Sequence, residues 1–89
     1  MLKPVNTKQF EKDFKLSVKR GKNTSKLKRV IVMLVNEEVL APRYNDHKLS
    51  GIFKLRRECH IEPDWLLIYK IEKKVIIFER TGTHSDLFK

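Results

Sequence analysis

Two histidines, an aspartate and an arginine are the residues of this sequence best suited to chemistry. His60 precedes the stretch Glu62-Pro63-Asp64, which is typical of a tight turn between two strands and ends with Asp64. Arg80 and His84 follow after a further apolar segment. An imidazole has an unperturbed pKa of about 6.5, so it can accept or donate a proton near neutral pH. Because a guanidinium binds phosphate oxygens, these residue types suit acid–base cleavage of a phosphodiester.

Residues 6–35 predict two amphipathic helices that form a hairpin. Asn6 and Gln9 have the spacing of a capping box, which starts a helix. The apolar stripe of this helix recurs every four residues, at Phe10, Phe14 and Val18. Gly21 suits a left-handed helix end, and the next helix has three candidate caps, Asn23, Thr24 and Ser25. The second helix repeats apolar residues at helical spacing, namely Leu27, Val30, Ile31, Leu34 and Val35.

From residue 52 onwards the apolar pattern is that of strands. Residues 52–60 include alternating apolar and charged side chains, which predicts a half-buried strand. Residues 65–71 are almost continuously apolar, which predicts a central strand, and residues 75–80 predict the next one. Residues 2–5 suit a short edge strand. The predicted fold is therefore α+β, a helical hairpin packed on a twisted, mainly antiparallel sheet of about four strands.

Strand direction is expected to bring the reactive side chains together. In an antiparallel meander the first strand ends at His60 and the second begins near Asp64. The third strand returns to the same end and places Arg80 and His84 there. His47 precedes the first strand and starts at the opposite end of the sheet, so it joins the rim only if its loop folds across the sheet, and topology alone does not place it. One exposed rim should therefore hold the other four residues.

Composition restricts the partners of this chain. It has 20 Lys and Arg against 11 Asp and Glu, a net charge of +9. Its 89 residues suffice for one domain, residues 1–89, with a shallow site. The positive charge favours RNA or an acidic protein. The single cysteine, Cys59, fits a reducing cytosol and leaves a nucleophilic role as an alternative; no apolar segment is long enough to span a membrane.

Two aromatic residues near the rim are candidates to stack on unpaired bases. They are Trp65 and Phe88. Each has a structural alternative, because Trp65 opens an apolar strand and Phe88 can hold the C-terminal segment in place. Arg80 likewise has an alternative role in an ion pair with Glu58 or Glu79.

A zinc site is a further alternative for the rim. Its ligands would be His60, Asp64 and His84, but ligands at tight local spacing are too few for a typical zinc site. We therefore expect chemistry without a metal or any other cofactor.

Three motifs resemble those of the RelE/ParE toxin superfamily. They are Asp46-His47-x-Leu49-x-Gly51, Arg57-x-x-His60-x-x-Pro63-Asp64-Trp65-x-Leu67-x-Tyr69 and Arg80-x-Gly82-x-His84-x-x-Leu87-Phe88. They are most similar to the histidine-rich, YafQ-like branch. The length, the charge and the helical hairpin agree with this resemblance.

The resemblance implies a bacterial toxin of a type II toxin–antitoxin pair. Such a toxin is a cytoplasmic endonuclease that cuts mRNA on the ribosome without metal and is held inactive by a cognate antitoxin. By position, the resemblance assigns the catalytic residues His47, His60, Asp64 and His84. We expect His84 to be the general acid, and either His60 or Asp64 to be the general base. The substrate-binding residues by the same argument are Arg57, Trp65, Arg80 and Phe88.

Two other functions stay open at this point. Other branches of the superfamily inhibit DNA gyrase without catalysis, and a similar scaffold does not separate them from nucleases. The third possibility is a plain, basic RNA-binding module. The histidines favour the nuclease, because a gyrase inhibitor has no use for several titratable groups on one rim.

Overall fold

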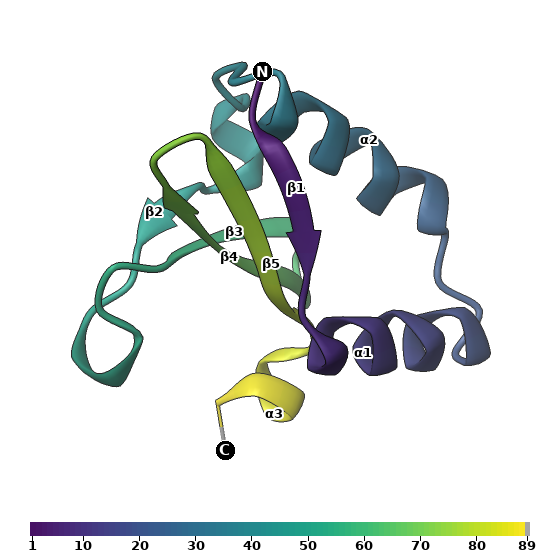
Figure 1. Ribbon diagram of the computed structural model, residues 1–89. Coiled ribbons are helices and arrows are strands. Elements are labelled where there is room, and N and C mark those ends of the chain that lie inside the picture. The colour runs from purple at the N-terminus through teal and green to yellow at the C-terminus, as the bar shows by residue number, and fades with distance from the viewer. Residues whose placement is uncertain (89) are drawn as a thin grey trace.

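A five-stranded mixed sheet forms the centre of the protein. The computed structural model describes residues 1–88 (Figure 1). The order across the sheet is β1-β5-β4-β3-β2, with β1 parallel to β5 and the other pairs antiparallel. The strands are β1 (Lys3–Asn6), β2 (His47–Lys48), β3 (Arg57–Glu62), β4 (Trp65–Glu72) and β5 (Val75–Gly82). The predicted α+β class and meander are confirmed, with one more strand than expected.

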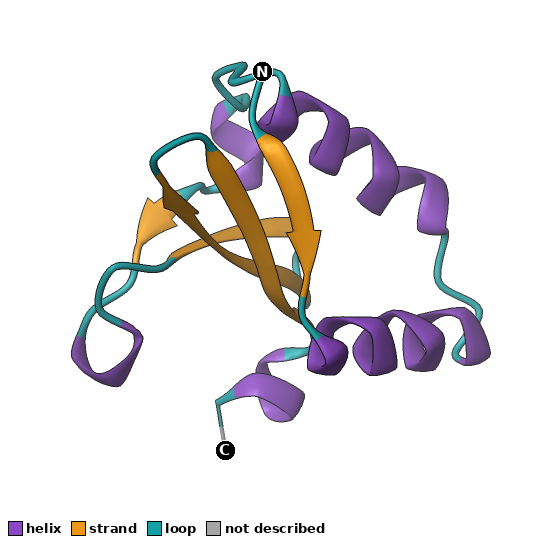
Figure 2. Ribbon diagram, viewed as in Figure 1, coloured by secondary structure: helices purple, strands orange, loops and turns teal. Residues whose placement is uncertain are grey.

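Within residues 1–88, three α-helices and two short 3₁₀ turns complete the fold (Figure 2). They are α1 (Lys8–Lys19), α2 (Thr24–Val35), η1 (Pro42–Tyr44), η2 (Gly51–Phe53) and α3 (His84–Leu87). Of the three candidate caps of α2, Asn23 is the one used, and its side chain accepts from the N–H of Ser25 at 3.1 Å. The cap of α1 is Thr7 rather than Asn6, and its hydroxyl accepts from the N–H of Phe10 at 3.0 Å.

The buried face of α1 differs from the predicted apolar stripe. Phe10, Asp13 and Ser17 are the buried residues of this helix, whereas Val18 is 53% exposed. The difference arises because the Asp13 carboxylate accepts hydrogen bonds from Arg80 and Thr81 of β5. These bonds turn the Asp13 face of α1 toward the sheet. Gly21, with a φ of 76°, follows the end of α1 in the left-handed conformation, as predicted.

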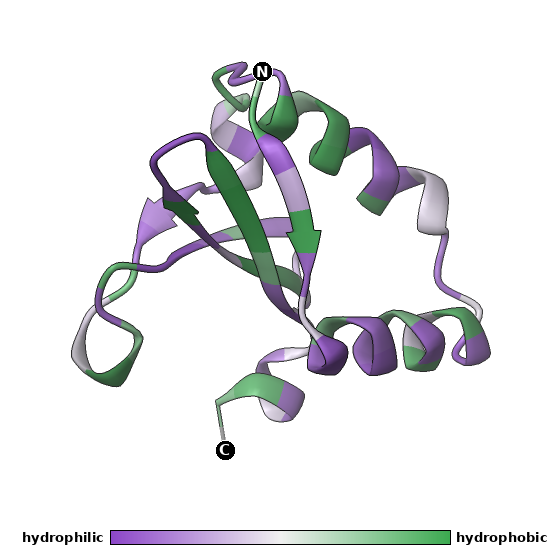
Figure 3. Ribbon diagram, in the orientation of Figure 1, coloured by the Kyte–Doolittle hydropathy of each residue, from purple (hydrophilic) through white to green (hydrophobic). Residues whose placement is uncertain are grey.

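The main core lies between α2 and one face of the sheet. Leu27, Val30 and Leu34 of α2 pack on apolar residues of β3, β4 and β5, including Leu67 and Phe78. Green apolar segments of α2 and of the central strands show this pattern in Figure 3. The opposite face has a smaller apolar cluster of Leu66, Ile68 and Leu87, with Leu49 and Phe53 packed against it. β4 is therefore buried on both faces, as its continuous apolar run predicts.

The strand predicted from residue 52 begins later, at Arg57. Residues 51–53 form η2 instead, and Leu55 has a φ of 76°, which interrupts an extended chain. Leu55, which the predicted alternation puts on the buried face, is 75% exposed. The shortened β3 leaves a protruding loop over residues 49–56, and the chain before this loop pairs with β3 as β2.

No helix within residues 1–88 is long and apolar enough to cross a membrane.

The hydroxyl of Thr81 connects the two central strands inside the core. It accepts from the Trp65 indole Nε1–H at 3.0 Å and donates to the Leu66 carbonyl at 2.6 Å. Substituting Thr81→Val removes both hydrogen bonds. The Trp65 indole N–H and the Leu66 carbonyl then each lose this buried partner. We expect the free energy of unfolding to fall by about 1–3 kcal/mol in urea denaturation. The exposed Ser50→Ala is the control, and an equal midpoint for both variants would contradict this role.

Candidate active site

Three histidines from separate elements form one cluster, His47, His60 and His84, here called the histidine cluster. His60 is on β3 and His84 opens α3, after the chain has returned along β5. The ring centroids of His60 and His84 are 5.7 Å apart, and those of His47 and His60 are 6.5 Å apart. The Pro63–Asp64 turn lies at the same end of the sheet. Strand direction therefore gathers His60, Asp64 and His84 as predicted.

Asp64 and His84 form the most direct acid–base pair of the site. Asp64 Oδ1 accepts from the backbone N–H of His84 at 2.8 Å and lies 2.6 Å from Nδ1 of the same residue. The backbone hydrogen bond, followed by the side-chain one, lowers the pKa of the Asp64 carboxyl. An ionised carboxylate only accepts, so the contact places a proton on Nδ1. Nε2 is then the ring nitrogen left for proton exchange with a substrate.

His47 also lies in the cluster, where the resemblance placed it and strand direction alone did not. In β2 it pairs directly with Glu58 of β3. This pairing exists because β3 begins at Arg57, so the preceding loop can turn back along the strand. His47 Nδ1 lies 2.6 Å from the Asn45 carbonyl oxygen, which fixes the orientation of the ring.

The buried carboxylate of Glu58 was missed as a site residue by the sequence analysis. Glu58 is 6% exposed, and its Oε2 lies 3.1 Å from His47 Nε2 and 3.8 Å from His60 Nε2. A signal was present, because alternation along β3 places Glu58 on the same face as His60. Glu58 links two of the three imidazoles and adds a second carboxylate to the site.

Arg80 lies on the histidine face, but a buried carboxylate holds its guanidinium. The register places Arg80 opposite Ile68, which is opposite Glu58. Its Nε donates to Asp13 Oδ2 at 2.8 Å and its Nη2 to Oδ1 at 3.4 Å. The predicted alternative partners, Glu58 and Glu79, are therefore wrong. The Arg80 side chain as a whole remains 33% exposed.

Trp65 is a core residue, which corrects its prediction as a base-stacking residue. It is 1% exposed, its indole N–H binds Thr81, and the Lys22 ammonium lies 5.7 Å from the centroid of its ring. The first residue of β4 points to the helix-covered face, so no base can reach this ring.

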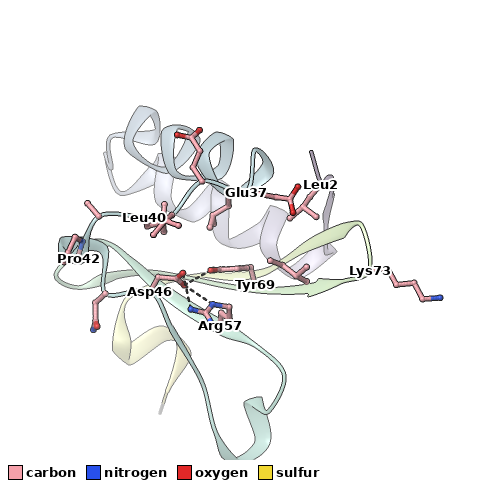
Figure 4. Close-up of a pocket in the computed structure, with 14 residues that line it drawn as sticks. Leu2, Glu37, Leu40, Pro42, Asp46, Arg57, Tyr69 and Lys73 are labelled. Atoms are coloured by element: carbon pink, nitrogen blue, oxygen red, sulfur yellow. Dashed lines mark hydrogen bonds and ion pairs between the residues drawn. The ribbon is translucent and has the colours of Figure 1, made fainter.

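Arg57 also lies away from the histidine cluster. It is paired with Tyr69, whose side chain belongs to the core under α2. Its guanidinium donates to both oxygens of Asp46 at 3.3 Å, and the Tyr69 hydroxyl donates to the same carboxylate (Figure 4). Alternation along β3 puts Arg57 on the face opposite His60, away from the histidine cluster, and its role as a substrate contact stays a prediction.

Phe88 remains available at the surface. It is 38% exposed, and its ring packs edge-on against Phe53 with centroids 5.4 Å apart. The ring therefore attaches the C-terminal segment to the protruding loop and still presents part of its surface. Its role in contacting bases stays a prediction.

Neither a thiol nucleophile nor a metal site is supported within residues 1–88. Cys59 is fully buried, and this burial raises the pKa of its thiol far above the ordinary value. A reactive cysteine needs the opposite conditions. No group of three or more His, Cys, Asp or Glu side chains in this part of the chain is arranged to hold a metal ion.

Comparison with known proteins agrees with this geometry. The family model "Bacterial toxin of type II toxin-antitoxin system, YafQ" matches residues 2–89. The mRNA interferase toxin YafQ of Escherichia coli K12 is 49% identical over 81 residues, covering 90% of this chain and 88% of that protein. A chain of the crystal structure of the E. coli DinJ-YafQ complex matches with a TM-score of 0.94 at 44% identity, and the match covers 100% of this chain and 100% of that one. A metal-bound toxin from Helicobacter pylori matches with a TM-score of 0.93 at 43% identity, covering 99% of this chain and 100% of that one.

The fold and the histidine cluster thus define a toxin of a bacterial type II toxin–antitoxin system. Within that class, the chain belongs to the YafQ family. This confirms the branch indicated by the three motifs.

A test of Asp13 follows from its contacts with Arg80. Asp13→Asn replaces one acceptor oxygen by an amide that cannot accept from the Arg80 guanidinium or the Thr81 N–H. Because Asp13 is 7% exposed, we expect a loss of about 1–3 kcal/mol in the free energy of unfolding, measured by urea denaturation. Glu11→Gln, an exposed change on the same helix, should leave it unchanged. Equal stability of the two variants would refute the role given to Asp13.

A second prediction concerns pH and Asp86, which holds α3 in place. Arg20 donates to both of its oxygens, at 2.7 and 3.3 Å, and Asp86 forms a capping box with Thr83. The Arg20 hydrogen bond, followed by the Thr83 backbone N–H, lowers the pKa of Asp86 well below its usual range. The resulting stability is present above the unfolded pKa of about 3.9 and is lost as the pH falls toward the folded value.

Urea unfolding of the parent and of Asp86→Asn at several pH values tests this sign. The parent should be the more stable protein at pH 6, and the difference should shrink below about pH 4. A constant difference across this range would show that the charge of Asp86 does not stabilise the fold.

Proposed function

We propose that this toxin is an mRNA interferase, a ribosome-dependent endoribonuclease of the bacterial cytoplasm that a cognate antitoxin inhibits. Its YafQ relative in E. coli bears this activity in its name, and a YafQ protein was crystallised with its partner DinJ. The observation that supports the chemistry best is the Asp64–His84 pair beside His60. Residues 1–89 would act as one domain. A gyrase inhibitor and a plain RNA-binding module are not favoured by the family.

The proposed reaction is attack by the ribose 2′-oxygen on the adjacent phosphorus. A general base takes the 2′-hydroxyl proton, and a general acid gives a proton to the leaving 5′-oxygen as the P–O5′ bond breaks. The products are a 2′,3′-cyclic phosphate and a 5′-hydroxyl. The two proton transfers need two separate groups, and the histidine cluster supplies two candidates, His60 and His84, with ring centroids 5.7 Å apart.

His84 is the proposed general acid. Asp64 holds its Nδ1–H, so Nε2 is the atom that gives the proton to the leaving oxygen. With a side chain 53% exposed, His84 is accessible to a polymer on the surface. The carboxylate of Asp64 also stabilises the positive charge of the ring before the transfer.

His60 is the proposed general base, ahead of Asp64. The lowered pKa of Asp64 makes this carboxylate a weak proton acceptor, and His84 already occupies its Oδ1. His60 is half-buried beside Glu58, whose negative charge stabilises the imidazolium that forms. In this proposal His47 orients Glu58, and Arg80 contacts the phosphate from its position on Asp13. Phe88 would contact a neighbouring base.

His84→Ala is the main test. General acid catalysis contributes about 10²–10⁴-fold, so the variant should lose growth arrest, and message cleavage by primer extension should fall by that factor. Its binding to antitoxin should persist. Ser85→Ala, the exposed neighbour, is the control. A fully toxic His84→Ala protein would overturn the proposal.

An experiment with a metal chelator distinguishes metal-dependent cleavage from the proton transfers proposed above. Purified toxin, dialysed against chelator, should cut translated message as well as the untreated protein does. Because a relative from Helicobacter pylori was crystallised with metal, restoration by added zinc or copper is the informative contrary result.

A further inference from the structure

A basic hollow lies along the edge of β3 next to His60. Strand β2 pairs only with Arg57 and Glu58, so within residues 1–88 no strand covers the rest of this edge. A hollow of about 610 Å³ opens there, bounded by α2, η1 and the end of β3. Its polar lining includes Lys26, Arg29, Arg43, Tyr44, His60 and Glu62. This hollow is called the edge groove below.

The edge groove has an excess of uncompensated positive charge. Its one carboxylate, Glu62, is bound by Lys26 at 3.0 Å and by Lys22 at 3.4 Å, and the Lys26 hydrogen bond lowers the pKa of Glu62. Arg29 and Arg43 take part in none of the ion pairs formed within residues 1–88. Both side chains are on exposed residues. Two guanidinium groups are therefore free to bind an anion.

The groove also presents a guanidinium fixed on an aromatic ring, that of Tyr44, which is half-buried and packs against the main core. The Arg43 guanidinium lies 4.9 Å from the Tyr44 ring centroid and donates to its hydroxyl at 3.0 Å. Backbone bonds from Tyr44 to Ala41 and from Asn45 to Pro42 hold this turn. The Asn45 carbonyl also faces His47 Nδ1, so the turn that positions Tyr44 is attached to the histidine cluster.

We infer that the edge groove binds the RNA segment next to the phosphodiester that is cut. Arg29 and Arg43 contact backbone phosphates, and the stacked Tyr44–Arg43 pair receives an unpaired base. This inference rests on the proposed function. A polymer cut at His60 continues beyond it, and the groove begins at that residue. Guanidinium groups and aromatic faces are the groups that bind single-stranded nucleic acid.

An acidic segment of a protein partner would also be attracted to this charge. The aromatic–guanidinium stack and the shared residue His60 favour a nucleic acid over a peptide, because a base has a flat face to stack and a peptide carboxylate does not. The protein alternative is therefore treated as an outcome of the test.

The test compares the double variant Arg29→Ala/Arg43→Ala with Lys8→Ala/Lys12→Ala. The second variant removes the same charge from exposed positions of α1 that do not line the groove. The probe is a short single-stranded RNA with 2′-O-methyl groups, which cannot be cleaved through the 2′-oxygen. Its affinity for the full chain is measured by fluorescence anisotropy at several salt concentrations.

Loss of two phosphate contacts should reduce the slope of log affinity against log salt by about 1.4 in the arginine variant. The lysine variant should keep the parent slope. Tyr44→Ala should weaken binding by about 5-fold to 150-fold, as loss of one stacked base does. Urea midpoints equal to that of the parent will show that the arginine variant is folded.

Three results would overturn the inference. They are equal slopes for the arginine and lysine variants, no binding of the RNA by the parent, and loss of antitoxin binding by the arginine variant with RNA binding unchanged. Because the probe is not cut, the result does not depend on catalysis. A toxin whose His84→Ala variant stays fully toxic would contradict the proposed nuclease without altering the binding measurement.

Discussion

The buried carboxylate of Asp13 is the interaction on which the active-site face depends. A charged group that is 7% exposed persists only when its oxygens are hydrogen-bonded. Asp13 meets this condition with the Arg80 guanidinium, the Thr81 N–H and the Gln9 amide. These bonds attach α1 to the end of β5, the point where the chain leaves the sheet toward His84.

Thr81 also connects α1 to the Asp64 side of the site through the core. Thr81 accepts the indole proton of Trp65, the residue that follows Asp64 in the chain. At the far end of α1, Arg20 binds Asp86 and so positions α3. The first helix thereby restrains both partners of the Asp64–His84 pair from behind, although it contributes neither. A small domain with a thin core achieves a defined geometry in this way, with polar contacts that act at a distance from the reacting groups.

The site itself is built from imidazole–carboxylate contacts on one exposed face. The Glu58 carboxylate contacts the imidazoles of His47 and His60, and the Asp64 carboxylate contacts that of His84. Glu58 is buried while Asp64 is exposed, so the two carboxylates act in different environments. Such a difference allows two otherwise similar imidazoles to take opposite roles in one reaction. The surrounding +9 charge compensates the phosphates that must approach two carboxylates.

Much of this arrangement was determined by the sequence alone. The change of apolar period, the Pro63-Asp64 turn and the order of the strands were sufficient to place His60 with His84, because these signals depend on neighbours a few residues apart. Only the tertiary structure decided that Trp65 is buried, that Arg57 faces away from the site, that Asp13 holds Arg80, and that His47 contacts Glu58. Each of these depends on strand register or on a partner distant in sequence. The left-handed Leu55, which shortens β3 and so allows β2 to form, is a conformation that no local propensity of leucine predicts.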